Sequence, residues 1–263
     1  MITIGIDPVI IGVGHFALRW YGLIVAAAIG IGAWVTLGEA ERKGFDREAI
    51  YNNLLWVLLA AVAGARLFHV ADHWSHTFAA QPLRILYVWQ GGLAIWGGVF
   101  GGLVAVGWLS WRNRWRLSRL LDMVAPGLVL GQGLGRIACV ITGDAMGQPT
   151  SGPFGIAYSN PAAMVPELGV YYTPMPLYET VMNLGIFILL WRLRKHDLPD
   201  GFLALLYLGL YSSGRFLLAY VSSYRIVALG MTQSQIVALV TLVAVIPLAF
   251  YVWKARLDVA TSR

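Results

Sequence analysis

Four arginines lie within or at the edge of long apolar stretches of the sequence: Arg19, Arg66, Arg136 and Arg215. An arginine at the centre of a membrane helix costs about 2.5–3.5 kcal/mol on insertion scales, so it normally faces a bundle interior and a partner. The planar guanidinium fork suits phosphate oxygens. For any single arginine, a packing role beside an acid or a carbonyl is an equal alternative. Arg19, at the start of its stretch, can reach water by snorkelling.

An acid and two tyrosines have the positions to join an arginine site. Glu179 lies near the start of an apolar stretch, where it is a candidate partner for an arginine. Tyr211 precedes Arg215 by four residues, so the two side chains share one face of a helix. Tyr21 opens the first apolar stretch. These groups indicate a polar layer that several helices would build together.

His69 belongs to a second group of polar residues. It follows Arg66 by three positions and precedes Asp72 and His73 by three and four, so all four can share one helix face. Such a group can handle protons, but a structural polar network is the favoured interpretation. The histidines and the single cysteine, Cys139, show no spacing that would indicate a metal site.

The elements that must position these residues are membrane helices. The chain is 58% hydrophobic and only 12% charged, with a mean hydropathy of +0.68, well outside the usage of soluble domains. Its apolar blocks have the length of about 20 residues that a bilayer-spanning helix needs. The sequence predicts an all-α bundle of about seven transmembrane helices, at about 18–37, 51–71, 94–111, 120–141, 174–191, 201–221 and 232–253.

The basic residues predict the orientation of this bundle. Thirteen of the 19 lysines and arginines lie in one set of alternate connections or in the C-terminal tail, and only Arg84 and Arg225 lie in the opposite set. By the positive-inside rule, the N-terminus is outside and the C-terminus is cytoplasmic. The net charge of +6 thus reflects the bilayer as partner and not nucleic acid.

Three of the arginines are then expected at one depth. Arg66, Arg136 and Arg215 each lie on an even-numbered helix, about 15–17 residues from its inner end, which corresponds to roughly 22–25 Å at 1.5 Å per residue. That level is near the outer face. A shared layer favours a common anionic ligand over three separate packing pairs.

Glycines mark a further feature of the third predicted helix. Gly97 and Gly101, and Gly98 and Gly102, form two small-xxx-small pairs that let helix backbones approach closely. The alternative is a glycine-lined surface that admits an acyl chain or head group near Trp96, and both can hold together. The polar segment of about residues 142–173 is expected to form a small extracytoplasmic cap on a single transmembrane domain, residues 1–263.

Six short motifs of the sequence, in their order and spacing, resemble those of the bacterial prolipoprotein diacylglyceryl transferases. The matching pieces are Trp20-Tyr21-Gly22-Leu23, Gly64-Ala65-Arg66-Leu67, the double-glycine segment 91–102, Gly135-Arg136 with Gly143-Asp144 and Gly147, Pro174 with Leu177-Tyr178-Glu179, and Tyr211 with Gly214-Arg215. Together they cover nearly the whole chain.

The resemblance implies an enzyme that moves the diacylglyceryl group of phosphatidylglycerol onto the lipobox cysteine thiol in the signal peptide of an exported prolipoprotein. Glycerol phosphate is released, as the first step of lipoprotein maturation, with no cofactor. The enzyme would lie in the bacterial inner membrane, with its active layer near the outer leaflet. Arg136 and Arg215 match catalytic arginines. The expected substrate-binding residues are Tyr21, Arg66, Trp96, Gly98, Asp144, Tyr178, Glu179 and Tyr211, with a supporting role favoured for Arg66.

The sequence departs from the family pattern where a base is expected. Trp96 stands where many members have a histidine, and Ala219 stands where an acid often follows the second motif arginine. His69 is the candidate base, Glu179 is an alternative, and a thiol near pKa 8.5 can also react without one. Two rival functions remain: a non-catalytic relative that binds anionic lipid or signal segments, and an anion transporter.

Overall fold

The computed structural model describes residues 1–13, 16–87 and 91–261 of the chain. Its seven described α-helices coincide with the seven predicted apolar segments within four residues, except that the last helix ends eight residues later than predicted. They are α1 (Trp20–Ala40), α2 (Arg47–Asp72), α3 (Ile95–Arg112), α4 (Leu117–Thr142), α5 (Met175–Leu193), α6 (Phe202–Leu218) and α7 (Gln233–Thr261). The largest difference at a start is in α2. It begins early because the Asp46 side chain caps it, accepting from the amides of Glu48 and Ala49 at 3.1 and 3.3 Å.

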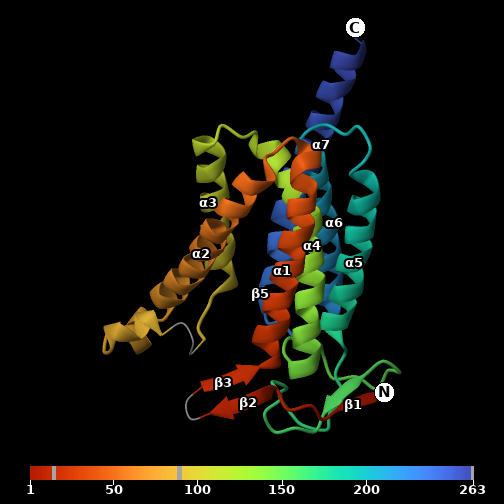
Figure 1. Ribbon diagram of the computed structural model, residues 1–263. Helices are drawn as coiled ribbons and strands as arrows, with labels where there is room; N and C mark the ends of the chain where they lie inside the picture. The colour runs from red at the N-terminus through yellow and green to blue at the C-terminus, as the bar shows by residue number, and fades with distance from the viewer. Residues whose placement is uncertain (14–15, 88–90, 262–263) are drawn as a thin grey trace. The chain divides into compact units, whose positions relative to one another are not determined.

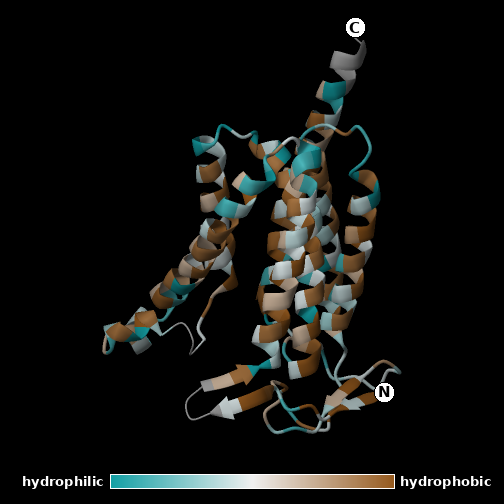
Figure 2. Cartoon of the chain, in the orientation of Figure 1, coloured by the Kyte–Doolittle hydropathy of each residue, from teal (hydrophilic) through white to brown (hydrophobic). Residues whose placement is uncertain are grey.

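Five of the described helices are long and apolar enough to cross a membrane: Trp20–Lys43, Arg47–Asp72, Leu117–Thr142, Phe202–Val221 and Gln233–Arg256. Figure 2 shows mostly hydrophobic and intermediate residues along these helices, with many of the hydrophilic residues at the connections. α3 and α5 are shorter, with 18 and 19 residues. The chain is therefore a mostly helical, multi-pass membrane protein.

The chain divides into two compact units, and the first comprises Met1–Thr36 and Leu121–Arg263. Its helices run side by side (Figure 1). α4, α5 and α6 share a core formed by Ala125, Val129, Ile186, Leu190, Leu203, Ala204 and Tyr207. α1 meets α4 at Gly32 and Gly127, where an added Cβ on Gly32 would come within 2.7 Å of the Gly127 carbonyl oxygen.

A buried carboxylate fixes the start of α6. Asp122 of α4 is 1% exposed and accepts hydrogen bonds from the amides of Gly201 and Ala204 at 2.9 and 3.0 Å. These amides lie at the N-terminus of α6, where main-chain donors have no partner within the helix. Asp122 thus caps a neighbouring helix and sets the position of α6 relative to α4.

Short strands, which the sequence analysis did not predict, join segments outside the helices of the first unit. β1 (Ile2–Ile4) pairs in parallel with β4 (Ile156–Tyr158), and β2 (Val9–Val13) pairs with β3 (Phe16–Arg19), which leads directly into α1. β5 (Ile226–Ala228) and β6 (Met231–Thr232) precede α7. These strands are too short for a visible period of alternating residues, and the partner of β1 lies more than 150 residues along the chain.

The segment after α4 folds as a small cap within the first unit. Gly143 starts it with φ +77°, a left-handed conformation that favours glycine. Met146, Ile156, Tyr158 and Tyr172 form its core. The Tyr158 hydroxyl donates to the Val140 carbonyl at 2.5 Å, and burial raises the pKa of this phenol.

The second unit, Leu37–Leu120, is built on the antiparallel helices α2 and α3. They cross at glycines: a Cβ on Gly97 would come within 2.2 Å of the Gly64 carbonyl oxygen, and a Cβ on Gly101 within 2.3 Å of the Ala60 carbonyl oxygen. The packing interpretation of the pair Gly97 and Gly101 is thereby confirmed. Between the helices lie η2 (Trp74–Phe78) and η3 (Pro82–Leu86).

Candidate functional site

Two arginines share one buried carboxylate in the first unit. The Glu179 side chain is 2% exposed. Arg136 Nε lies 2.5 Å from Glu179 Oε2, and Arg215 Nη1 donates to Glu179 Oε1. Each carboxylate oxygen therefore faces a different guanidinium. With two positive groups and one negative group, the trio carries a net charge of +1.

Three helices bring this trio together. Arg136 lies in the second half of α4, Glu179 is the fifth residue of α5, and Arg215 lies in the last turn of α6. A cation in the last turn of a helix is favoured by the helix dipole. The side chain of Arg136 is 28% exposed and that of Arg215 is 13% exposed, so both stay more accessible than the acid between them. The accessible side of the trio is thus its positive side.

Tyrosines surround the two arginines. Tyr211 lies one turn before Arg215 on α6 and interacts electrostatically with Arg136, Arg215 and Glu179. Its ring centroid is 5.9 Å from that of Tyr207. Arg215 also lies over the ring of Tyr224, with its guanidinium carbon 5.7 Å from the centroid. Phenol groups can donate hydrogen bonds to a bound anion, so this wall adds donors to the two guanidiniums.

Tyr21, Cys139 and Asp144 lie on the α1 and cap side of Arg136. Tyr21 is 40% exposed and interacts electrostatically with all three other groups. Cys139 Sγ is 4.0 Å from Asp144 Oδ2, and the Asp144 amide donates to the Cys139 carbonyl at 3.1 Å. Of the predicted first-unit residues, Tyr21, Asp144, Glu179 and Tyr211 therefore gather with Arg136 and Arg215.

Tyr178 is the predicted first-unit residue with the least defined surroundings. It precedes Glu179 on α5 and is half-buried, and its amide donates to the Pro174 carbonyl at 3.2 Å. Because successive residues of a helix point in different directions, Tyr178 does not share the face of Glu179. Its expected contact with a substrate stays a prediction.

Arg66, in the second unit, has a very different environment. It is buried, and its guanidinium donates to five main-chain carbonyl groups, those of Arg84, Ile85, Tyr87, Gly91 and Gly92, at 2.5–3.4 Å. Phe78 lies against it, with the ring centroid 5.4 Å away. All three guanidinium nitrogens are used in this way, which argues for the supporting role of Arg66.

His69 packs beside Arg66 in the same unit. Its ring centroid is 4.3 Å from that of His73 and 6.0 Å from that of Phe78. Gly92, at φ +75°, covers it so closely that a Cβ there would come within 2.5 Å of His69 Nε2. His69 is thus part of the support of the chain before α3, and its role as a base stays a prediction.

Trp96 and Gly98 lie on the first turns of α3. Trp96 is exposed, and a Cβ on Gly98 would lie at ordinary contact distance, 3.5 Å from the Ala61 carbonyl oxygen. Gly98 therefore leaves little free space against α2. Exposure of Trp96 is compatible with contact to lipid, and the substrate-binding role of both residues stays a prediction.

Sequence reasoning missed three contributors to the first-unit site. Tyr224 lies beyond α6, where no helical spacing connects it to Arg215. Gln132 and Tyr207 form a hydrogen bond of 2.8 Å between α4 and α6. The sequence signal for this pair was Gln132 itself, because a glutamine within an apolar helix needs a hydrogen-bond partner.

These observations define a class: a multi-pass helical membrane protein with a tyrosine-lined cluster of two arginines around one carboxylate. The chain belongs to the prolipoprotein diacylglyceryl transferase family, whose model matches residues 8–251. This membership confirms the resemblance found in the sequence motifs.

Several relatives share most of their length with this chain, and each is a phosphatidylglycerol–prolipoprotein diacylglyceryl transferase. The protein of Thermosynechococcus vestitus is 36% identical over 238 residues, which cover 88% of this chain and 86% of the relative. That of Gloeobacter violaceus is 34% identical over 252 residues, covering 94% and 91%. That of Listeria welshimeri is 31% identical over 250 residues, covering 94% and 90%.

Proposed function

We propose that this chain transfers the diacylglyceryl group of phosphatidylglycerol to the lipobox cysteine thiol of exported prolipoproteins, the first step of lipoprotein maturation. The relatives are transferases named for phosphatidylglycerol and prolipoprotein. The observation that carries the proposal is the pair Arg136 and Arg215, held on opposite oxygens of buried Glu179 with a net positive charge.

In the reaction, the cysteine sulfur forms a thioether with the diacylglycerol carbon that carried the phosphate. The bond from that carbon to the phosphate oxygen breaks, and its electron pair leaves with glycerol phosphate. The thiol proton passes to a base or to water. Arg136 and Arg215 hold the lipid phosphate by charge-assisted hydrogen bonds and stabilise the negative charge that grows on the leaving oxygen.

The other predicted residues have supporting roles in this proposal. Tyr21 and Tyr211 position the head group from two sides of the arginine pair, and Asp144 and Tyr178 complete the surroundings. In the second unit, exposed Trp96 contacts lipid and Gly98 lets α3 pack closely on α2 beside it. Arg66 supports the surrounding chain, and His69 is the candidate proton acceptor. A dedicated base is not essential, because a few per cent of a free thiol is already ionised at pH 7.

We also propose that all seven helices cross the inner membrane as a single transmembrane domain, with the cap of residues 142–173 outside the cytoplasm. The basic connections support this orientation. It puts Arg136 and Arg215 near the outer leaflet, where an exported signal peptide and phosphatidylglycerol can both reach them.

A product assay tests the transfer. Purified protein in phosphatidylglycerol vesicles is given a lipobox peptide, and mass spectrometry looks for the diacylglyceryl thioether together with released glycerol phosphate. Both products are expected. Peptide or lipid binding without either product would favour a non-catalytic relative, and uptake of small anions into vesicles without product would favour a transporter.

A further inference from the structure

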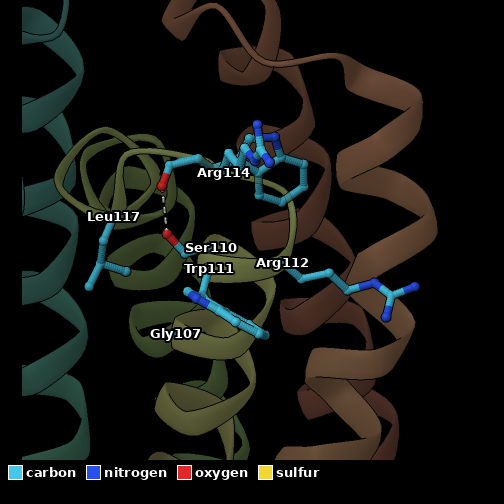
Figure 3. A pocket seen from close by; sticks show the side chains of 7 residues that line it. Gly107, Ser110, Trp111, Arg112, Arg114 and Leu117 are labelled. Atoms are coloured by element: carbon cyan, nitrogen blue, oxygen red, sulfur yellow. Dashed lines mark hydrogen bonds between the residues drawn. The ribbon is translucent and has the colours of Figure 1, made fainter.

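A pocket lies at the turn that joins α3 to α4, within the second unit (Figure 3). Its volume is about 910 Å³, in the range of about 300–1,000 Å³ that small-molecule sites occupy. The lining residues are Gly107, Ser110, Trp111, Arg112, Arg114, Trp115 and Leu117. None of them belongs to the proposed transfer site, so any ligand here requires a separate explanation.

Hydrogen bonds give this pocket a defined shape. The Ser110 hydroxyl donates to the Trp115 carbonyl at 2.9 Å, drawn as the dashed line in Figure 3, and the Trp115 amide returns a bond of 2.9 Å to the Ser110 carbonyl. Asn113 Nδ2 donates to the Leu109 carbonyl at 2.8 Å. Phe45 packs edge-on against the Trp115 ring, with centroids 5.7 Å apart. These contacts fix the conformation of the turn that lines the pocket.

The two arginines of the pocket are available to an anion. Both are exposed, and within the part of the chain that the structure describes neither forms an ion pair. Arg112 lies over the ring of Trp108, with its guanidinium carbon 5.4 Å from the centroid. Arg114 has φ 54°, an uncommon conformation for a residue other than glycine. Two unpaired guanidiniums beside one pocket favour a negatively charged occupant.

The surroundings of the pocket indicate a lipid and not a dissolved anion. α3 ends at Arg112 and α4 begins at Leu117. With both helices crossing the bilayer as proposed above, this turn lies where they leave the hydrocarbon region. Trp111 is 78% exposed and Trp108 is 50% exposed, as is typical of the aromatic belt at a membrane interface. Gly107, Trp111 and Leu117 contribute apolar atoms to the lining of the pocket, which suits the glycerol and acyl part of a phospholipid better than water.

We propose that this α3–α4 pocket binds the head group of an anionic phospholipid of the adjacent leaflet. Arg112 and Arg114 contact the phosphate, and Trp111 lies along the glycerol and upper acyl region. Basic pockets beside membrane helices bind such head groups through charge and hydrogen bonds. The site is separate from the transfer site and does not depend on the proposed reaction.

Photo-crosslinking of lipid tests this site. The full chain is placed in phosphatidylcholine nanodiscs that contain a small fraction of phosphatidylglycerol with a photoreactive acyl chain. After illumination, mass spectrometry measures the labelling of peptides from residues 105–119. Unlabelled phosphatidylglycerol competes, and labelling is compared with that by a phosphatidylcholine probe with the same acyl chain.

Two variants separate the pocket from general charge. Arg112→Gln with Arg114→Gln should weaken competition by phosphatidylglycerol roughly fivefold per arginine. Gly107→Phe keeps both arginines but fills the pocket. A Cβ at residue 107 meets no atom within 4 Å, and the change replaces a helical glycine, so it should not destabilise the protein. Arg47→Gln with Arg192→Gln removes the same charge from exposed positions outside the pocket and is the matched control.

The proposal expects competable labelling of residues 105–119 that falls in both test variants and persists in the control. Equal labelling by the two lipid probes would overturn it, and so would full labelling of the Gly107→Phe variant. Competition by inorganic phosphate as strong as that by phosphatidylglycerol would identify a site for dissolved anions and would also overturn the lipid assignment.

Discussion

The arginines in the helices of the two units have opposite environments. In the second unit, Arg66 donates to five main-chain carbonyls and is closed off by Phe78. In the first unit, Arg136 and Arg215 share a single acid and stay partly exposed. Carbonyl groups satisfy the hydrogen bonds of Arg66 without cancelling its charge, whereas Glu179 cancels one charge of two.

This difference supports a structural role for Arg66 and the proposed ligand-binding role of Arg136 and Arg215. A guanidinium whose nitrogens all point at carbonyls holds chain segments together and has little left to offer a substrate. Two guanidiniums around one carboxylate are pre-positioned and still lack one negative charge. An anion that enters between them supplies that charge, so this part of the first unit is the better place for a phosphate.

The largest expected effect is the loss of either arginine of the pair. Arg136→Ala and Arg215→Ala should each lower transfer by at least about 100-fold, because each removes a donor to the leaving phosphate. Product formation is measured by mass spectrometry after membrane insertion has been verified. Arg192→Ala, on an exposed site, is the control that should keep full activity, and comparable turnover in all three variants would move the site elsewhere.

Removal of the shared acid should have the next largest effect. Glu179→Gln leaves two partly exposed guanidiniums without their shared negative partner, which should cost at most about 3 kcal/mol of stability. The arginines lose their fixed positions but keep their charge, so kcat should fall more than KM for phosphatidylglycerol rises. Unfolding in detergent and steady-state kinetics measure the two effects. A rise in KM with unchanged kcat would instead make Glu179 a simple binding residue.

Arg66 should affect stability more than chemistry. Arg66→Ala leaves five main-chain carbonyls without their donor and should destabilise the protein by about 3 kcal/mol, with limited proteolysis increased near Arg84–Tyr87. Arg66→Lys should rescue only part of this loss, since an ammonium group has three donors and no planar fork. The folded fraction should keep its KM for phosphatidylglycerol, and a large increase in that KM would place Arg66 among the substrate contacts.

The smallest effect is expected for His69. His69→Gln should lower transfer less than about tenfold, because its ring packs on His73 and Phe78 and a thiol is partly ionised near neutral pH. The pH dependence of transfer should keep its shape. A loss above 100-fold, together with a changed pH profile, would establish His69 as the proton acceptor.

Helix positions could be predicted well from the sequence because apolar length is a local signal. The segment expected at about 174–191 is α5, Met175–Leu193, and that expected at about 201–221 begins as α6 at Phe202. The strands could not be predicted, because β1 is only three residues long and its partner β4 lies more than 150 residues away. Pairing over such a distance leaves no periodic trace near either strand.

Only those residues of the candidate site that lie within the apolar segments could be predicted from their spacing. Glu179 and Tyr211 could be grouped with the arginines from their positions in the apolar segments. Depth alone also grouped Arg66 with them, because counting residues along a helix does not reveal which carbonyls a side chain meets. Tyr224 could not be predicted as a site residue, since only the fold of the chain after α6 brings it to Arg215.

The strand pair of β1 and β4 restricts how many times the chain can cross a bilayer. Paired strands lie on the same side of a membrane, so an even number of crossings must separate them. If α1, α2 and α4 cross, as their apolar lengths allow, a fourth crossing is required, and α3 is the helix between them that can supply it. Its 18 residues extend about 27 Å.

The bridge between Gly147 and Ser222 sets the same condition on α5, which lies with α6 between those two residues. A crossing by α6 requires one by α5 as well. Each of these strand pairings therefore requires an even number of membrane crossings between its two partners. If the five candidate spans cross, these pairings also require complete crossings by α3 and α5, the two helices outside that set.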